Sequence, residues 1–173
     1  MKILKNISNY ENEEDYLAIF NSALLVQLHV VYSVLQSYIK RNYQKEYFKK
    51  LGILTIFLDV SLLMLVIVAA RSIYTYFFNE YHIYIFLVIV CLVQITLDVF
   101  VHYFTYYIPK GFNGIIDIMK YHNKELGLFK IIYQNIIIIV ITLLLACNFA
   151  TLSLNLNIIF MLINLYLIPF IFV

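Results

Sequence analysis

Long apolar stretches alternate with short polar stretches along most of this chain. Each apolar stretch is about 20 residues or longer, the length that an α-helix needs to cross the hydrocarbon core of a bilayer. We therefore expect an all-α fold: a polytopic integral membrane helical bundle with four or five transmembrane helices and short loops. The expected helices cover residues 16–39, 51–78, 82–108, 128–151 and 154–173.

The first of these helices leaves two placements open. The polar side chains of residues 16–39 share one arc, so this helix could span the membrane or lie flat in the interface. We favour spanning, because the side chains of this arc are only weakly polar and the basic residues begin only at Lys40. Residues 1–15 form a polar, acidic N-terminal segment, and residues 16–173 form a single membrane domain.

Basic residues gather in two of the connections. Residues 109–127 form an amphipathic loop in which we expect a short helix on the membrane surface, and the other connection holds Lys40, Arg41, Lys45, Lys49 and Lys50. Cytoplasmic loops carry an excess of Lys and Arg, so both connections and the C-terminus should face the cytoplasmic or equivalent side. The basic run fixes topology in the simplest interpretation, and it also offers contact with anionic lipid head groups.

Composition supports a membrane protein. The chain is 64% hydrophobic and 13% charged, whereas a typical soluble domain is about 45–50% apolar and about 25% charged. A net charge of +2 gives no reason to expect nucleic acid as a partner. Phe, Tyr, Met, Ile, Asn and Lys make up 85 of the 173 residues, and Gly, Ala, Arg and Pro only 14, which indicates an AT-rich genome.

One expected helix carries an unusual polar stripe. Cys91, Gln94, Asp98, His102 and Thr105 are spaced by three, four, four and three residues, which places them within an arc of about 80° on a helix. Ionisable side chains facing lipid are costly, so the stripe should face a protein partner. We therefore expect helix 82–108 to be central, with the stripe directed inward and in contact with helix 51–78 near Asp59.

Several polar residues fall at a similar depth when helix positions are counted at about 1.5 Å per residue. We hypothesise an intramembrane polar cluster, in which Asp98 and His102 also pair as i and i+4 neighbours. Its members are Asp59, Gln94, Asp98, His102 and His29. The cluster either joins helices structurally or serves as a proton or ion relay or a site for a small polar ligand.

Two further interpretations involve a bound group. His29, Asp59, Asp98 and His102 could ligate zinc or non-haem iron, and His29 with His102 could ligate haem. No motif fixes their convergence, and the sequence has no hydrolase, phosphate-loop or metalloprotease motif. We therefore expect no metal, no cofactor and no catalytic residues.

Our first functional expectation is a non-enzymatic integral membrane protein that serves as an accessory or structural subunit of a larger membrane assembly. An organellar complex or a virion membrane fits the compositional bias, with the lipid bilayer and other membrane subunits as partners and no nucleic acid. The alternative is a small proton or ion channel or transporter subunit that uses the Asp/His cluster. A membrane enzyme is a third option, which bound metal or haem would favour.

Overall fold

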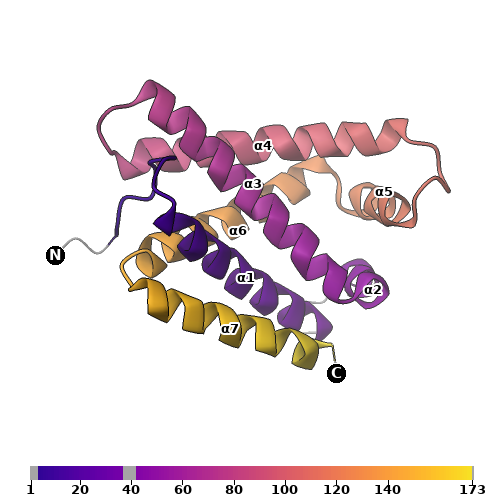
Figure 1. Cartoon of the computed structure of the whole chain (residues 1–173). Coiled ribbons are helices and arrows are strands. Elements are labelled where there is room, and N and C mark those ends of the chain that lie inside the picture. The colour runs from indigo at the N-terminus through magenta and orange to yellow at the C-terminus, as the bar shows by residue number, and fades with distance from the viewer. Residues whose placement is uncertain (1–3, 37–41, 173) are drawn as a thin grey trace.

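The computed structural model describes residues 4–36 and 42–172 of the chain. All regular secondary structure in these residues is helical, and five of the helices are long and apolar enough to cross a membrane, namely α1, α3, α4, α6 and α7. The helices are α1 (Glu14–Leu35), α2 (Asn42–Leu51), α3 (Ile53–Phe77), α4 (Ile83–Tyr107), α5 (Gly114–Leu126), α6 (Leu128–Phe149) and α7 (Leu154–Ile171). The predicted all-α membrane helical bundle is confirmed (Figure 1).

The two short helices differ in how far the sequence predicted them. The surface helix expected within residues 109–127 is α5. Helix α2 was not expected, because its many basic residues were interpreted only as a charged loop. Its apolar residues Tyr47, Phe48 and Leu51 recur at helical spacing, and Phe48, which is 3% exposed, packs into the core. Lys40 and Arg41 lie outside the described residues.

Each short helix joins a spanning helix through one glycine. Gly52, between α2 and α3, has φ = 55°, and Gly127, between α5 and α6, has φ = 73°. A positive φ is unfavourable for residues with a Cβ atom and costs glycine little. No other atom would crowd a Cβ at either position, so the backbone conformation itself accounts for glycine there. The chain thus turns twice from a surface helix into a spanning helix in the same way.

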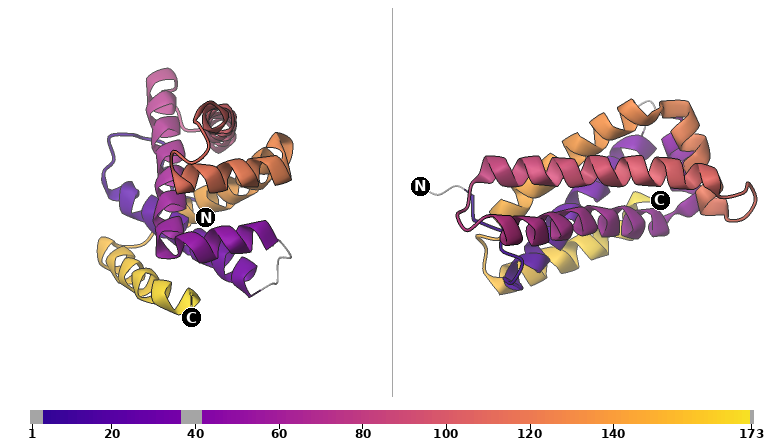
Figure 2. Two further views of the ribbon diagram at one scale, coloured as in Figure 1. Left: turned by 90° about the vertical axis from the view of Figure 1, so that its right-hand side faces the viewer. Right: turned by 90° about the horizontal axis from the view of Figure 1, so that it is seen from above.

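The bundle has two distinct ends (Figures 1 and 2). Helices α2 and α5 contact each other at one end, which the C-terminus of α7 also reaches. We call this the basic end, because Lys45, Lys49, Lys50, Lys120 and Lys124 belong to its short helices. The opposite end holds residues 4–13 and the loops 78–82 and 150–153, and we call it the plug end. The helices alternate between the ends as predicted, and which end faces the cytoplasm stays a prediction.

Helix α1 occupies the centre of the bundle. In the most apolar 18-residue stretch of α1, 67% of the residues are buried, against 17% in the same stretch of α4. Helix α1 packs against α3, α6 and α7. The expectation that α4 is central was wrong. Small residues such as Ala18, Ser22 and Ala23, all 0% exposed, let neighbouring helices approach α1 closely. Helix α4 instead exposes bulky side chains such as Phe100 and Tyr103, which face away from the bundle.

Candidate functional site

A polar pocket with a volume of about 390 Å³ lies within the bundle. Every helix except α7 contributes to its wall. The side chains that carry polar atoms into the wall are Gln27, Gln44, Tyr47, Asp59, Gln94, Asp98, His102, Asn123, Gln134 and Asn135. No lysine or arginine is among the lining residues that the structure describes. The wall therefore combines two carboxylates with amides and lacks a cationic side chain of fixed charge.

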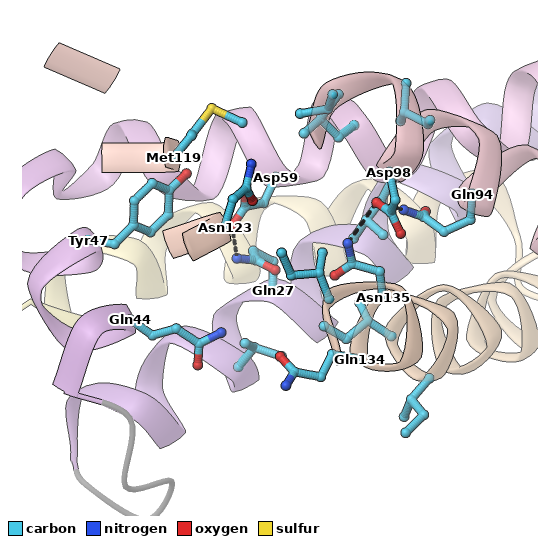
Figure 3. Close-up of a pocket in the computed structure, with 18 of the residues that line it drawn as sticks. Gln27, Gln44, Tyr47, Asp59, Gln94, Asp98, Met119, Asn123, Gln134 and Asn135 are labelled. Atoms are coloured by element: carbon cyan, nitrogen blue, oxygen red, sulfur yellow. Dashed lines mark hydrogen bonds between the residues drawn. The ribbon is translucent and has the colours of Figure 1, made fainter. Parts of the chain in front are cut away.

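Asp98 is the most buried acid of the pocket, at 9% exposure. Gln94, one turn earlier on α4, donates from Nε2 to Asp98 Oδ1 over 2.9 Å. Asn135 of α6 donates from Nδ2 to the same oxygen over 2.8 Å (Figure 3). The other oxygen, Oδ2, is buried and has no hydrogen-bond partner among the described residues. Buried polar atoms are nearly always paired, so this oxygen has an unused capacity to accept hydrogen bonds.

Asp59 enters the same pocket from α3 and is half-buried. Gln27 of the central helix, itself 3% exposed, donates from Nε2 to Asp59 Oδ2. Tyr47 of α2 also lines the pocket (Figure 3). Burial, together with the negative charge of Asp59, raises the pKa of the Tyr47 phenol above its usual range. The phenol therefore stays protonated at neutral pH.

Helix α5 closes part of the pocket at the basic end. Asn123, which is 8% exposed, donates from Nδ2 to Thr105 Oγ1 over 3.1 Å and so joins α5 to α4. Thr105 Oγ1 donates in turn to the main-chain oxygen of His102 over 2.8 Å. The His102 ring lies beside Tyr106, and its Nδ1 is buried without a hydrogen-bond partner in the described part of the chain.

The structure brings four of the five predicted cluster residues to one pocket. Asp59, Gln94, Asp98 and His102 all line it. His29 does not, because its side chain is exposed on the outside of α1. Within residues 4–36 and 42–172, no hydrogen bond joins Asp98 to His102, so the expected i, i+4 pair does not form. Gln94, which lies one turn from Asp98 in the opposite direction along α4, donates to Asp98 instead.

The displaced His29 also separates the suggested metal and haem ligands. Neither the four-residue metal set nor the two-histidine haem pair converges, because both sets include His29. Among the described residues, no group of three or more His, Cys, Asp or Glu side chains could hold a metal ion.

Sequence reasoning predicted Gln94 but missed two other residues that hold the carboxylates. Gln27 and Asn135 are amides within long apolar helices, and each donates to one acid. An amide in a membrane-length apolar stretch is itself a sign of an inward-facing partner, and this signal could have identified both residues. Gln27 is on a different face of α1 from the polar arc that contains His29, so the arc directed attention to the wrong face.

A second polar cluster lies at the plug end. Arg71 of α3 is 0% exposed, and its Nη2 donates to the main-chain oxygens of Asn9 and Asn12, the latter over 2.9 Å. Its guanidinium carbon lies 4.4 Å from the centre of the Tyr16 ring. Asp15, which is also buried, lies 3.7 Å from Arg71. Arg71 thereby holds the N-terminal segment against the bundle.

Further contacts fix this segment, which we call the N-terminal plug (residues 4–13). Lys5 Nζ lies 3.1 Å from Asp15 Oδ1, and Asn12 Nδ2 donates to Asp15 Oδ2 over 2.7 Å. Ile7 is 0% exposed and belongs to the hydrophobic core. The amide of Lys5 donates to the main-chain oxygen of Cys147 on α6 over 3.3 Å. The plug therefore covers one end of the bundle, away from the pocket.

Comparison with known proteins adds no assignment: no protein-family model, no curated protein and no solved structure matches this chain.

Proposed function

We propose that this chain is a non-enzymatic, multi-pass membrane protein that takes up a cation, in the simplest case a proton, into its polar pocket, as a small channel or transporter subunit does. The observation that carries the proposal is the pocket wall: two carboxylates, Asp59 and Asp98, share a buried space in which no Lys or Arg lies among the described lining residues. A buried carboxylate without a cation is costly. A proton or another cation that enters the pocket removes this cost.

The depth of the two acids supports uptake from the basic end. Asp59 lies six residues from the start of α3, and Asp98 lies nine residues from the end of α4. At a rise of about 1.5 Å per residue, the two acids lie about 9 and 14 Å from that end. The plug end is closed by packed core residues and by the N-terminal plug. The pocket therefore reaches only part of the way through the bundle. A cation needs a conformational change or a partner protein to cross the whole membrane.

Proton flux into liposomes tests this proposal. The purified protein is reconstituted with a pH-sensitive dye inside, and a potassium diffusion potential drives proton entry. We expect flux from the wild type and at least about a tenfold loss in Asp59→Asn and Asp98→Asn, since intramembrane acids of relays are functional by default. Glu80→Gln is the matched control, because Glu80 is an exposed carboxylate in the loop at the plug end. Flux no higher than in protein-free liposomes at every pH, or full flux in both Asn variants, refutes the proposal.

A second candidate function is the accessory or structural subunit of a larger membrane assembly. The observation that favours it is the high exposure of three helices. In the most apolar 18-residue stretches of α4, α6 and α7, only 17–22% of the residues are buried within the chain. Those faces meet lipid, further copies of this chain or other subunits. The mass of the protein extracted in mild detergent tests this candidate. A monomer without partners contradicts it, whereas a defined larger complex supports it.

A further inference from the structure

The pocket holds two carboxyl groups, and no Lys or Arg is among the lining residues that the structure describes. The side-chain donors to Asp98 are the uncharged amides of Gln94 and Asn135, and Asp59 accepts from the uncharged amide of Gln27. The lysines of α2 and α5 do not line the pocket. Amide donors hold the carboxylates in place without neutralising them. A ligand that binds here therefore gains most if it carries a positive charge.

Asp98 presents a specific contact point for such a ligand. It is only 9% exposed, and its Oδ2 has no hydrogen-bond partner in the part of the chain described. Asn135 and Gln94 both bind the other oxygen and so fix the orientation of the carboxylate (Figure 3). An ammonium group has three donors and no acceptor. It can therefore satisfy Oδ2 and still donate to the amide oxygens of the wall.

The size and lining of the pocket indicate that the cation has an apolar body. A cavity of about 150 Å³ is enough to hold benzene, and the volume here is about 390 Å³. Apolar side chains from α1, α3, α4 and α6 form much of the wall, among them Val30, Leu62, Leu97, Val101, Ile131 and Ile138. A bare metal ion or a proton leaves this apolar space unfilled. A compact organic group fills it and gains about 25 cal/mol for each Å² of apolar surface removed from water.

We propose that the pocket binds a small organic cation, namely a primary ammonium on a compact apolar body, with the ammonium against Asp98 Oδ2. Tyr47 adds an aromatic face that attracts cations. The inference deepens the proposed function, because it rests on the same pocket and names the class of cation that the pocket accepts.

The test compares three ligands of nearly the same shape. Benzylammonium, benzyl alcohol and benzoate carry charges of about +1, 0 and −1 at neutral pH. Each is titrated calorimetrically into the full-length protein in lipid nanodiscs, with empty nanodiscs as the reference for partitioning into lipid. We expect saturable binding of benzylammonium, at least tenfold weaker binding of benzyl alcohol and no binding of benzoate. Equal affinities for all three, or no saturable binding of benzylammonium, overturn the proposal on the unaltered protein.

Two variants then locate the site. Asp98→Asn removes the charge and keeps the side-chain shape, and it should weaken benzylammonium binding at least tenfold. Thr96→Val is the matched control on the same helix, because Thr96 is exposed and its hydroxyl donates only to its own helix, at Leu92 O. Unchanged affinity in Asp98→Asn overturns the assignment to Asp98. Binding without proton flux refutes the proton-uptake form of the proposed function and leaves the ligand site standing, whereas flux without binding refutes the ligand site alone.

Discussion

The plug end and the polar pocket both bury charged side chains, but they compensate the charge differently. At the plug end, Arg71 and Lys5 each lie against Asp15, and main-chain oxygens accept from Arg71. In the pocket, Asp98 meets only amides among the described residues, and one of its oxygens stays unpaired. The first arrangement balances its charges within the chain, although Arg71 Nε and Nη1 have no hydrogen-bond partner among the described residues. The second lacks a positive partner, which is what a site for a cation requires.

This difference separates a structural cluster from a candidate functional one. Charge burial costs free energy in both places, because each ion loses its hydration. At the plug end, attraction between the opposite charges and the hydrogen bonds of Arg71 offset part of that cost. The pocket recovers less of it within the chain, and strained or unsatisfied groups in native proteins concentrate at functional sites.

The largest effect is expected from Arg71→Ala. This change leaves Asp15 buried with only Lys5 and Asn12, removes donors from Asn9 and Asn12, and ends the contact with the Tyr16 ring. Loss of one partner from a buried pair costs about 3–5 kcal/mol. Thermal unfolding in detergent measures the loss, and limited proteolysis reports release of the plug.

Lys49→Ala serves as the control for that variant, since Lys49 is an exposed cation on α2. We expect it to unfold like the wild type. If Arg71→Ala is as stable as the control and its plug resists protease, the cluster at the plug end does not hold the segment in place.

The same substitution at two acids gives the sharpest contrast. Asp15→Asn removes the negative charge between Arg71 and Lys5, so it should destabilise the protein by about 3 kcal/mol. Asp98→Asn removes a carboxyl group that faces no Lys or Arg among the described lining residues, so it should change stability little or raise it by about 1 kcal/mol. The free energy of unfolding of the two variants is compared in one detergent. Equal losses at both sites would show that the two clusters are energetically alike.

Asn135→Leu probes the hydrogen bond that joins α6 to α4. The variant takes one donor from Asp98 Oδ1 and leaves that oxygen with Gln94 alone, which should cost about 1–3 kcal/mol. Asn148→Leu is the matched control on the same helix, because Asn148 is exposed and donates only to the main chain of Leu144. The two are compared by thermal unfolding. A loss no greater than in the control means that the contact between Asn135 and Asp98 adds nothing to stability.

The smallest effect concerns the pH dependence contributed by Tyr47. Its pKa is raised from 10.0 in the folded protein by burial and by Asp59, so the folded state keeps a proton that the unfolded chain releases at alkaline pH. This contribution to stability is intact below about pH 10 and falls as the pH rises above it. Tyr47→Phe should therefore lose stability less steeply between about pH 9 and pH 11.

Tyr76→Phe is the control, since Tyr76 is 83% exposed. Unfolding midpoints are followed over the same pH series for both variants. If the slope of the Tyr47 variant matches that of the wild type, the phenol is not held protonated by its position in the pocket wall.

Much of the fold follows from local physics. The five spanning helices begin and end within about four residues of the expected positions wherever the structure describes them, because helix length and hydropathy depend on neighbouring residues and the bilayer thickness. The glycines at positions 52 and 127 and the amphipathic residues of α5 are signals of the same local kind. The sequence by itself thus determined an all-α membrane bundle and one inward stripe on α4.

The tertiary structure decided which faces meet. Helical spacing shows that Gln94, Asp98 and His102 share one face, but not which helix lies opposite to it. Small residues made α1 the central helix, and that packing put Gln27 against Asp59, Asn135 of α6 against Asp98, and His29 on the outside. Such partners come from segments far apart in the chain, and each pairing depends on how all the helices fit together. For that reason the acids and Gln94, which lies one turn from Asp98 on the same helix, were predictable from the sequence, and Gln27 and Asn135, which come from other helices, were not.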